Sequence, residues 1–188
     1  MTSTLPPYSD EFLAAQDADE LVRLLIRNED RAPRNLIDEC ARRGDEMIDR
    51  FEALLEKDYY WSQDQANGEW WLLFHAVMIL GLIPDARAGA LLIRFMRRMD
   101  EAGDETLEEW LGGYWPVLLQ NKPDSYLGAL RSLAQDPAAG WYTRVEAIGA
   151  VIARGHAAGG AALDEALAWA ARIAFADKED LDVRVMTG

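Results

Sequence analysis

The sequence predicts an all-α fold, an α-α superhelix (solenoid) of about four to five antiparallel helix pairs. Its 188 residues include 29 Ala and 24 Leu, but only 21 Val, Ile and Thr together. Ala and Leu favour helices, whereas β-branched residues favour strands. Half of the chain is hydrophobic, which is enough for one continuous core, and a single Cys excludes a disulfide scaffold. We therefore expect one α-helical repeat domain over 1–188.

Residues 8–32 are expected to form an N-terminal cap of short helices. Ser9 and Asp10 offer side-chain oxygens that can cap a first helix. Asp17 or Asp19 can cap the next one in the same way.

Residues 33–57 are expected to form the first helix pair. Pro33 suits the first turn of a helix, and Gly44 ends that helix shortly before Asp45 starts the second. The aromatic and polar residues 58–68 predict a loop.

Residues 69–100 are expected to form the second pair. Segment 69–83 is apolar on nearly all sides, which predicts a helix buried on more than one face. Pro84 breaks that helix, and segment 85–99 follows as an amphipathic one.

Two further pairs are expected over 106–135 and 141–176, after a charged loop at 101–105. Gly155–Gly160 is expected to form a flexible joint inside the last pair. The final segment, 177–188, is interpreted as a tail or as the start of a truncated further unit.

The helix pairs repeat along the chain. Pro84-Asp85 aligns with Pro123-Asp124, and Gly89-Ala90-Leu91 then falls on Gly128-Ala129-Leu130, at a spacing of 39 residues. Shifting the alignment back by 40 residues, or forward by a further 33, matches the neighbouring segments of the sequence. A spacing of roughly 33–40 residues with two helices per unit is typical of an α-solenoid.

One stretch of this repeat resembles a known family. Residues His75–Leu91, HAVMILGLIPDARAGAL, resemble a HEAT-type unit, and Glu146–Gly155, EAIGAVIARG, is a looser echo. The likeness covers about 33–176 and departs from the pattern at 101–121. The layout is similar to bacterial HEAT-like domains of unknown function, although this chain lacks the Cys-rich zinc motif that some of them carry. The resemblance implies an interaction scaffold, with the second helix of each pair lining a concave surface.

The charge of the chain limits its partners. Against 33 Asp and Glu there are 19 Lys and Arg, a net charge of −14. Such a surface repels nucleic-acid phosphates and anionic membranes, so neither is expected as a partner. The longest stretch without a charged residue, Trp70–Pro84, is short for a membrane span, and Met1–Asp10 does not resemble a secretory signal. We expect a cytoplasmic protein.

The sequence contains no recognisable catalytic, metal-binding or cofactor-binding motif. Cys40 lies on an apolar helix stripe, where it is expected to pack as a small hydrophobe. His75 lies in the apolar segment, and we expect a core histidine bonded to a carbonyl or carboxylate rather than a ligand or base. We expect no cofactor and consider an enzyme improbable.

A basic cluster is the first candidate binding surface. Arg94, Arg97 and Arg98 share a helix face with Arg87. They can neutralise nearby carboxylates, or they can anchor an acidic peptide or a phosphate, because guanidinium groups suit bidentate partners. In the second case we expect them to be unpaired within the chain. The double substitution Arg94→Glu with Arg97→Glu would then abolish binding and leave the melting temperature unchanged.

An acidic patch and several aromatic residues are the other candidates. The patch can simply be solvated at a helix N-terminus, or it can receive a cation or a basic partner. Seven Trp are present, and we expect Trp71, Trp115 and Trp169 in the core. The remaining aromatic candidates can pack between helices or serve as interface anchors. The acidic candidates are Glu101, Asp104, Glu105, Glu108 and Glu109, and the aromatic ones are Tyr59, Tyr60, Trp61 and Trp70.

Three functions are consistent with these sequence features. The first is a non-enzymatic protein- or peptide-binding scaffold that uses the concave face and its arginines. The second is a structural or regulatory segment of a longer protein or oligomer, which predicts an exposed apolar patch near Val183–Met186. The third is an enzyme or small-ligand binder with an aromatic pocket, which predicts His75 at a cleft beside a carboxylate.

Overall fold

All secondary structure in the described residues is helical. The computed structural model describes residues 8–62, 65–176 and 179–187, and it contains no strand in these ranges. None of the helices described there is both long and apolar enough to cross a membrane. The α-helices are α1 (Asp10–Ala14), α2 (Ala18–Asn28), α3 (Arg34–Arg42), α4 (Asp45–Leu55), α5 (Asn67–Leu82), α6 (Ala86–Ala102), α7 (Glu105–Leu111), α8 (Trp115–Leu119), α9 (Leu127–Ala134), α10 (Trp141–Ala158), α11 (Ala161–Ala174) and α12 (Leu181–Thr187). Three 3-10 helices join them: η1 (Glu29–Arg31), η2 (Asp58–Trp61) and η3 (Asp124–Tyr126).

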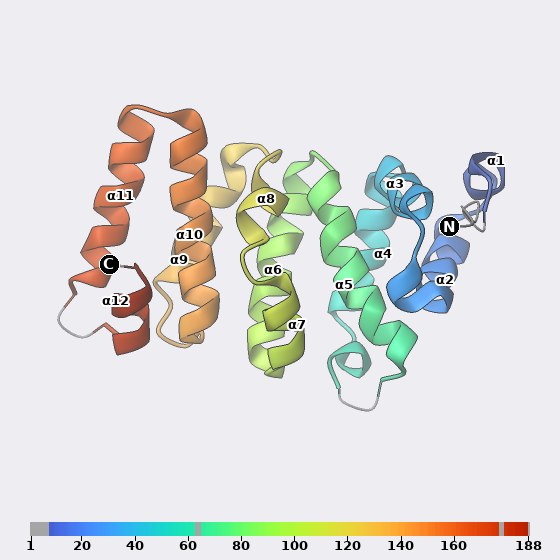
Figure 1. Ribbon diagram of the computed structural model, residues 1–188, viewed down its shortest axis with the longest axis horizontal. Helices are drawn as coiled ribbons and strands as arrows, with labels where there is room; N and C mark the ends of the chain where they lie inside the picture. Colours follow the sequence, from blue (N-terminus) through green and yellow to red (C-terminus); the bar gives the residue numbers. More distant parts are fainter. Residues whose placement is uncertain (1–7, 63–64, 177–178, 188) are drawn as a thin grey trace, which may run out of the picture.

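Helices pack against their neighbours in two layers. In one layer α1, α3, α5, α8, α10 and α12 each contact the next member of the series. In the other layer α2, α4, α6 and α9 do the same, and α5, α9 and α10 also contact helices of the opposite layer. Figure 1 shows the result as a row of helices that begins with α1 and α2 and ends with α11 and α12. The chain therefore advances in one direction from its N-terminus to its C-terminus.

Helix α5 lies at the centre of the core. Its residues Leu72, Leu73, Ala76 and Leu80 are fully buried, because α2, α3, α6 and α8 pack around it. Each buried Leu side chain contributes about 1.5–3 kcal/mol relative to its exposed state. Gly81 allows α8 to approach, since a Cβ at this position would overlap the side chain of Leu118. The expectation of a helix buried on several sides is confirmed.

Ion pairs connect successive helices of the second layer. Arg50 on α4 bonds Asp19 on α2, 31 residues earlier, and Arg131 on α9 bonds Glu165 on α11, 34 residues later. Between them, arginines of α6 reach back to carboxylates of α4. The sequence separations of these pairs are similar because each pair connects neighbouring helices of the row.

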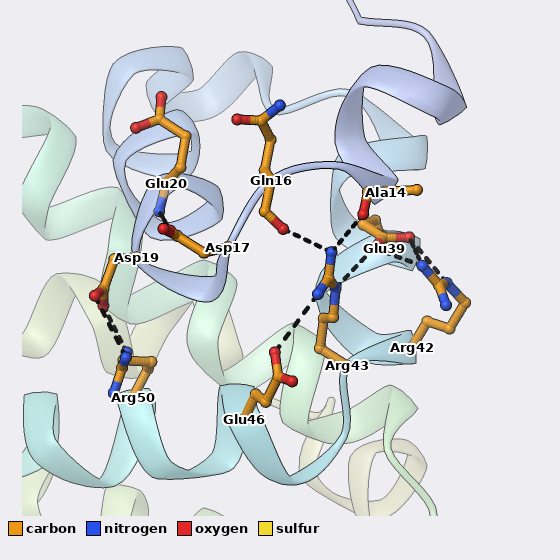
Figure 2. A network of polar contacts seen from close by, with 10 residues as sticks. All are labelled: Ala14, Gln16, Asp17, Asp19, Glu20, Glu39, Arg42, Arg43, Glu46 and Arg50. Atoms are coloured by element: carbon orange, nitrogen blue, oxygen red, sulfur yellow. Dashed lines mark hydrogen bonds and ion pairs between the residues drawn. The ribbon is translucent and has the colours of Figure 1, made fainter.

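A second set of polar contacts fixes the N-terminal helices (Figure 2). The guanidinium of Arg43 donates to the carbonyl oxygens of Ala14 and Gln16, at 2.9 and 2.7 Å, and to the carboxylate of Glu39. Arg42 donates to the same carboxylate from its other side. Burial opposes ionisation of Glu39, but the hydrogen bonds from the two arginines lower its pKa overall. Arg43 thus holds the end of α1 against α3.

The helix N-caps and most helix positions agree with those expected from the sequence. The side chain of Ser9 accepts a hydrogen bond from the amide of Phe12, and that of Asp17 accepts one from Glu20. Trp115 and Trp169 are buried, as expected, but Trp71 is only half-buried. The core prediction for Trp71 is therefore wrong, because its side of α5 faces a surface aromatic cluster described below.

Three expected loops are partly helical. The expected loop 58–68 contains η2, and its last two residues belong to α5. Helix α6 extends to Ala102, so Glu101 lies on a helix rather than in a loop. Helix α10 extends to Ala158, so the expected flexible joint is reduced to Gly159 and Gly160. Gly155 has a packing role, because a Cβ there would lie 2.8 Å from the Cβ of Ala166 on α11.

Glu29 has a backbone conformation that normally requires glycine. Its φ of 50° and ψ of −130° match those of Gly44 (55°, −115°) and Gly160 (51°, −132°) at other helix boundaries. The buried ring of His75 donates from Nε2 to the carbonyl oxygen of Glu29, at 2.7 Å, and so helps to hold this geometry. The expectation of a core histidine bonded to a carbonyl is confirmed. Non-glycine residues in such regions carry about 1–3 kcal/mol of strain.

Replacing Glu29 by Gly should therefore stabilise the protein. We expect the free energy of unfolding of Glu29→Gly to rise by about 1 kcal/mol, because relief of strain exceeds the entropy that glycine adds to the unfolded chain. Urea denaturation followed by circular dichroism measures this change. The matched control is Asp30→Gly at the next position, where φ is not positive and the substitution should destabilise. Equal losses in both variants would contradict the strain at Glu29.

A buried ion pair attaches the C-terminal helix. The guanidinium of Arg144 on α10 donates to both carboxylate oxygens of Glu179, at 2.7 and 2.6 Å, and to the carbonyl of Ala134. Both side chains of the pair are almost completely buried. Val183 is the buried apolar residue of α12. The hydrogen bond from Arg144 lowers the pKa of Glu179, so the attachment favours the ionised carboxylate.

Attachment of α12 should therefore weaken in acid. A carboxylate with a lowered pKa in the folded state contributes stability that is present above its unfolded pKa, and this stability is lost as the pH falls below about 4.5. The protection factors of the α12 amides, which are measured relative to the intrinsic exchange rate at each pH, should fall in this range. In Glu179→Gln, exchange should already be fast at neutral pH, since breaking a buried pair costs about 3 kcal/mol or more. Equal protection of α12 in both proteins at pH 7 would contradict this role.

Candidate binding site

The arginine surface is neutralised within the chain. All four arginines that were candidates for anchoring an acidic partner form ion pairs, so the expectation that they are unpaired is wrong. For Arg87 and Arg94 the reason is that α4 packs beside α6 and presents carboxylates at helical spacing, whereas the partners of Arg97 and Arg98 lie outside α4. The pairs are Arg87 with Asp45, Asp49 and Glu52; Arg94 with Glu52 and Glu56; Arg97 with Asp136; and Arg98 with Asp58 and Glu101.

Charge reversal at these arginines should destabilise the fold. The variant Arg94→Glu with Arg97→Glu loses three ion pairs, those with Glu52, Glu56 and Asp136, and places like charges side by side. We expect a loss of about 1–2 kcal/mol in the free energy of unfolding, measured by urea denaturation. The neutral double variant Arg94→Gln with Arg97→Gln should lose less than half as much. An unchanged stability in the reversed variant would show that these pairs contribute nothing.

Four aromatic side chains form a cluster on the surface of α5 and α7. Helix α5 carries Trp70, Trp71 and Phe74 within little more than one turn, and Trp110 of α7 lies against all three. The ring centroids of Trp71 and Trp110 are 5.1 Å apart and perpendicular, and those of Phe74 and Trp110 are 5.9 Å apart. Trp110 is 49% exposed, so the cluster presents an aromatic surface to solvent. We call these four residues the aromatic cluster.

The sequence pointed to only one member of this cluster. Trp70 was a candidate because it is adjacent to Trp71 and must point differently. Trp110 was missed, although a signal exists: Leu107 and Leu111 form the buried stripe of α7, and Trp110 lies beside this stripe. Only the packing of α7 against α5 shows that it completes the cluster.

The carboxylates of α7 and its cap have no cationic partner among the described residues, and one of them, Asp104, contacts the aromatic cluster. Asp104 caps α7 by accepting from the amide of Leu107, at 2.9 Å, and also accepts from the indole N–H of Trp70, at 3.1 Å. Burial raises the pKa of Glu108, and the neighbouring charges of Asp100, Glu105 and Asp104 raise it further. In the described part of the chain no Lys, Arg or His lies within ion-pair distance of the four carboxylates of α7 and its cap, Asp104, Glu105, Glu108 and Glu109.

A hollow of about 740 Å³ adjoins the cluster, between η2, the start of α5 and the α6–α7 connection. Trp61 and Trp70 contribute its aromatic surface, and Asp104 and Glu105 are its charged lining residues. Its lining consists of Trp61, Ser62, Gln65, Asn67, Trp70, Ala102, Gly103, Asp104, Glu105 and Thr106. Its volume is in the range of ligand pockets, roughly 300–1,000 Å³. Four of the residues singled out in the sequence thus line one site.

The other candidates lie outside this hollow. Tyr59 is half-exposed and donates its hydroxyl hydrogen to Glu69, at 2.6 Å. Tyr60 is half-buried against the core. Glu101 belongs to α6, where it lies 3.9 Å from Arg98.

The chemistry expected of an enzyme is not assembled around His75 or Cys40. His75 does not line the hollow, and burial lowers its pKa. Cys40 is buried, and burial raises the pKa of its thiol to about 12, which confirms its interpretation as a core residue. No group of three or more His, Cys, Asp or Glu among the residues described is placed to hold a metal ion.

Comparisons with known proteins give no match: no family model fits the chain, and neither the curated proteins nor the solved structures contain a significant relative.

Proposed function

We propose that this chain is a HEAT-like α-solenoid that acts as a non-enzymatic binding scaffold, and that its partner presents a basic, amphipathic protein segment. The observation that carries the proposal is the aromatic cluster of α5 and α7, together with the carboxylates of α7 and its cap, which have no cationic partner among the described residues. The arginines, by contrast, are paired within the chain.

The packing pattern supports the solenoid. Each layer proceeds from one helix to the next, and ion pairs at separations of 31–42 residues connect adjacent units. These separations agree with the repeat of 33–40 residues in the sequence. In such an architecture the second helix of each pair, here α4, α6, α9 and α11, lines the concave surface, as the HEAT resemblance implies.

The surface chemistry supports a basic, amphipathic partner. Trp is enriched in the energetic centres of protein interfaces, and Trp110 is already held by its neighbours, so little side-chain entropy is lost on binding. Lys and Arg of the partner can pair with the carboxylates of α7 and its cap, of which Asp104 contacts Trp70. The net charge of −14 attracts a basic segment from a distance.

An amphipathic peptide offers a direct test of this surface. We expect a helical Leu/Lys peptide to bind, and an otherwise identical Leu/Glu peptide not to bind, in fluorescence anisotropy titrations. Trp110→Ala should weaken binding by about 30-fold, the effect of losing an interface hot spot of about 2 kcal/mol. Phe175→Ala at the far end of the molecule removes a similarly exposed aromatic ring and should leave binding unchanged.

Two results would contradict the proposal. One is equal affinity for the basic and the acidic peptide. The other is a Trp110→Ala protein that melts like the parent and binds the basic peptide equally well.

A second candidate function is a structural segment of a larger assembly. Around the buried Val183, α12 exposes Leu181, Val185 and Met186 by 60–70%, and Phe175 at the end of α11 is 76% exposed. The apolar patch expected near Val183–Met186 is therefore present, although Val183 itself is buried. We propose this function as the alternative, and the mass of the protein in solution, measured by light scattering, tests self-association.

A further inference from the structure

We propose that the hollow between Trp61 and Trp70 receives one cationic side chain, a lysine or an arginine, of the basic segment. This inference rests on the proposed function and adds to it the group that determines specificity. It is argued from the walls of the hollow, its charge and its connection to the aromatic cluster.

The aromatic walls of the hollow are suited to a cation. Cations bind over the faces of Trp rings, and the guanidinium of Arg98 already lies 5.7 Å from the ring centroid of Trp61. The indole N–H of Trp61 is bonded to the carbonyl oxygen of Leu55, at 3.1 Å, which fixes the ring. Trp70 is fixed in the same way by its bond to Asp104. The two rings are therefore positioned before a ligand arrives.

The polar groups of the hollow are suited to a positively charged ligand that donates hydrogen bonds. Asp104 and Glu105 give it two negative charges, and no Lys, Arg or His is among its described lining residues. The side-chain oxygen of Gln65 is buried and has no hydrogen-bond donor within the described part of the chain. Lysine and arginine side chains supply several donors and no acceptor. Anionic ligands would be repelled by the same carboxylates.

The hollow is continuous with the aromatic cluster through Trp70. The ring of Trp70 lies 5.0 Å from that of Trp71 and 6.4 Å from that of Trp110, while Trp70 also lines the hollow. One bound segment can therefore place an apolar side chain on the cluster and a cationic side chain in the hollow. This arrangement distinguishes a partner with adjacent apolar and basic residues from a uniformly basic one.

The test uses the indole N–H signals of the tryptophans in ¹H–¹⁵N spectra, assigned with single Trp→Phe variants. The probes are the N-acetyl amides of arginine and lysine, with N-acetylcitrulline amide as a neutral compound of nearly the same shape as the arginine probe. We expect the cationic probes to shift the Trp61 and Trp70 signals saturably. The citrulline probe should not shift them.

Matched variants identify which carboxylates attract the cationic probes. Asp104→Asn with Glu105→Gln removes both charges, and Asn can still cap α7, so the fold should persist. Because Asn cannot also accept from Trp70, Glu105→Gln alone is the variant that removes a charge without releasing this ring. In the double variant we expect at least a tenfold loss of affinity for the cationic probes. Glu109→Gln removes a carboxylate of the same helix that does not line the hollow, and its affinity should change less than twofold.

The outcomes separate this inference from the proposed function. Equal shifts with citrulline, or unchanged affinity in Asp104→Asn with Glu105→Gln, would overturn it. A Leu/Lys peptide that shifts the Trp71 and Trp110 signals but not that of Trp61 would contradict the proposed role of the hollow. The proposal that the aromatic cluster binds a basic segment would still hold. Failure of every cationic probe and of the peptide would overturn both.

Discussion

The burial of α5 on several sides is the constraint on which the rest of the structure depends. Because α2, α3, α6 and α8 all pack against it, its apolar residues are shared between four neighbouring helices. The half-buried side of the same helix carries Trp70, Trp71 and Phe74. The position of the aromatic cluster is therefore set by the central helix of the core, and α7 adds Trp110 to a surface that is already rigid.

Basic and acidic side chains have different roles near α5. The arginines of α6 are used within the molecule, where they connect α6 to carboxylates of α4 and to Asp136. The carboxylates at α7 have no such partners among the described residues. In this strongly acidic chain the arginines of α6 are used at contacts with neighbouring segments, whereas Asp104 is available at the aromatic surface.

The sequence predicted local structure better than it predicted the site. Caps such as Ser9 and Asp17 and the all-round apolar pattern of α5 are local signals, and they located these elements correctly. The pairing of Arg94 with Glu52 depends on how two helices 42 residues apart in sequence pack, which no local pattern shows. The same holds for Trp110, whose neighbours come from α5, and for Gly155, whose role depends on α11.

The one-directional packing of the helices also bears on how the chain folds. Contacts join helices that are near one another in sequence. The ion pairs between different helices, such as those of Arg50 and Arg131, close loops of similar length. Loops of this size have a modest entropy of closure, and a low contact order is associated with fast folding. Structure can therefore nucleate at α5 and grow outward in both directions. The helices at the two ends, α1 and α12, would join last and open first.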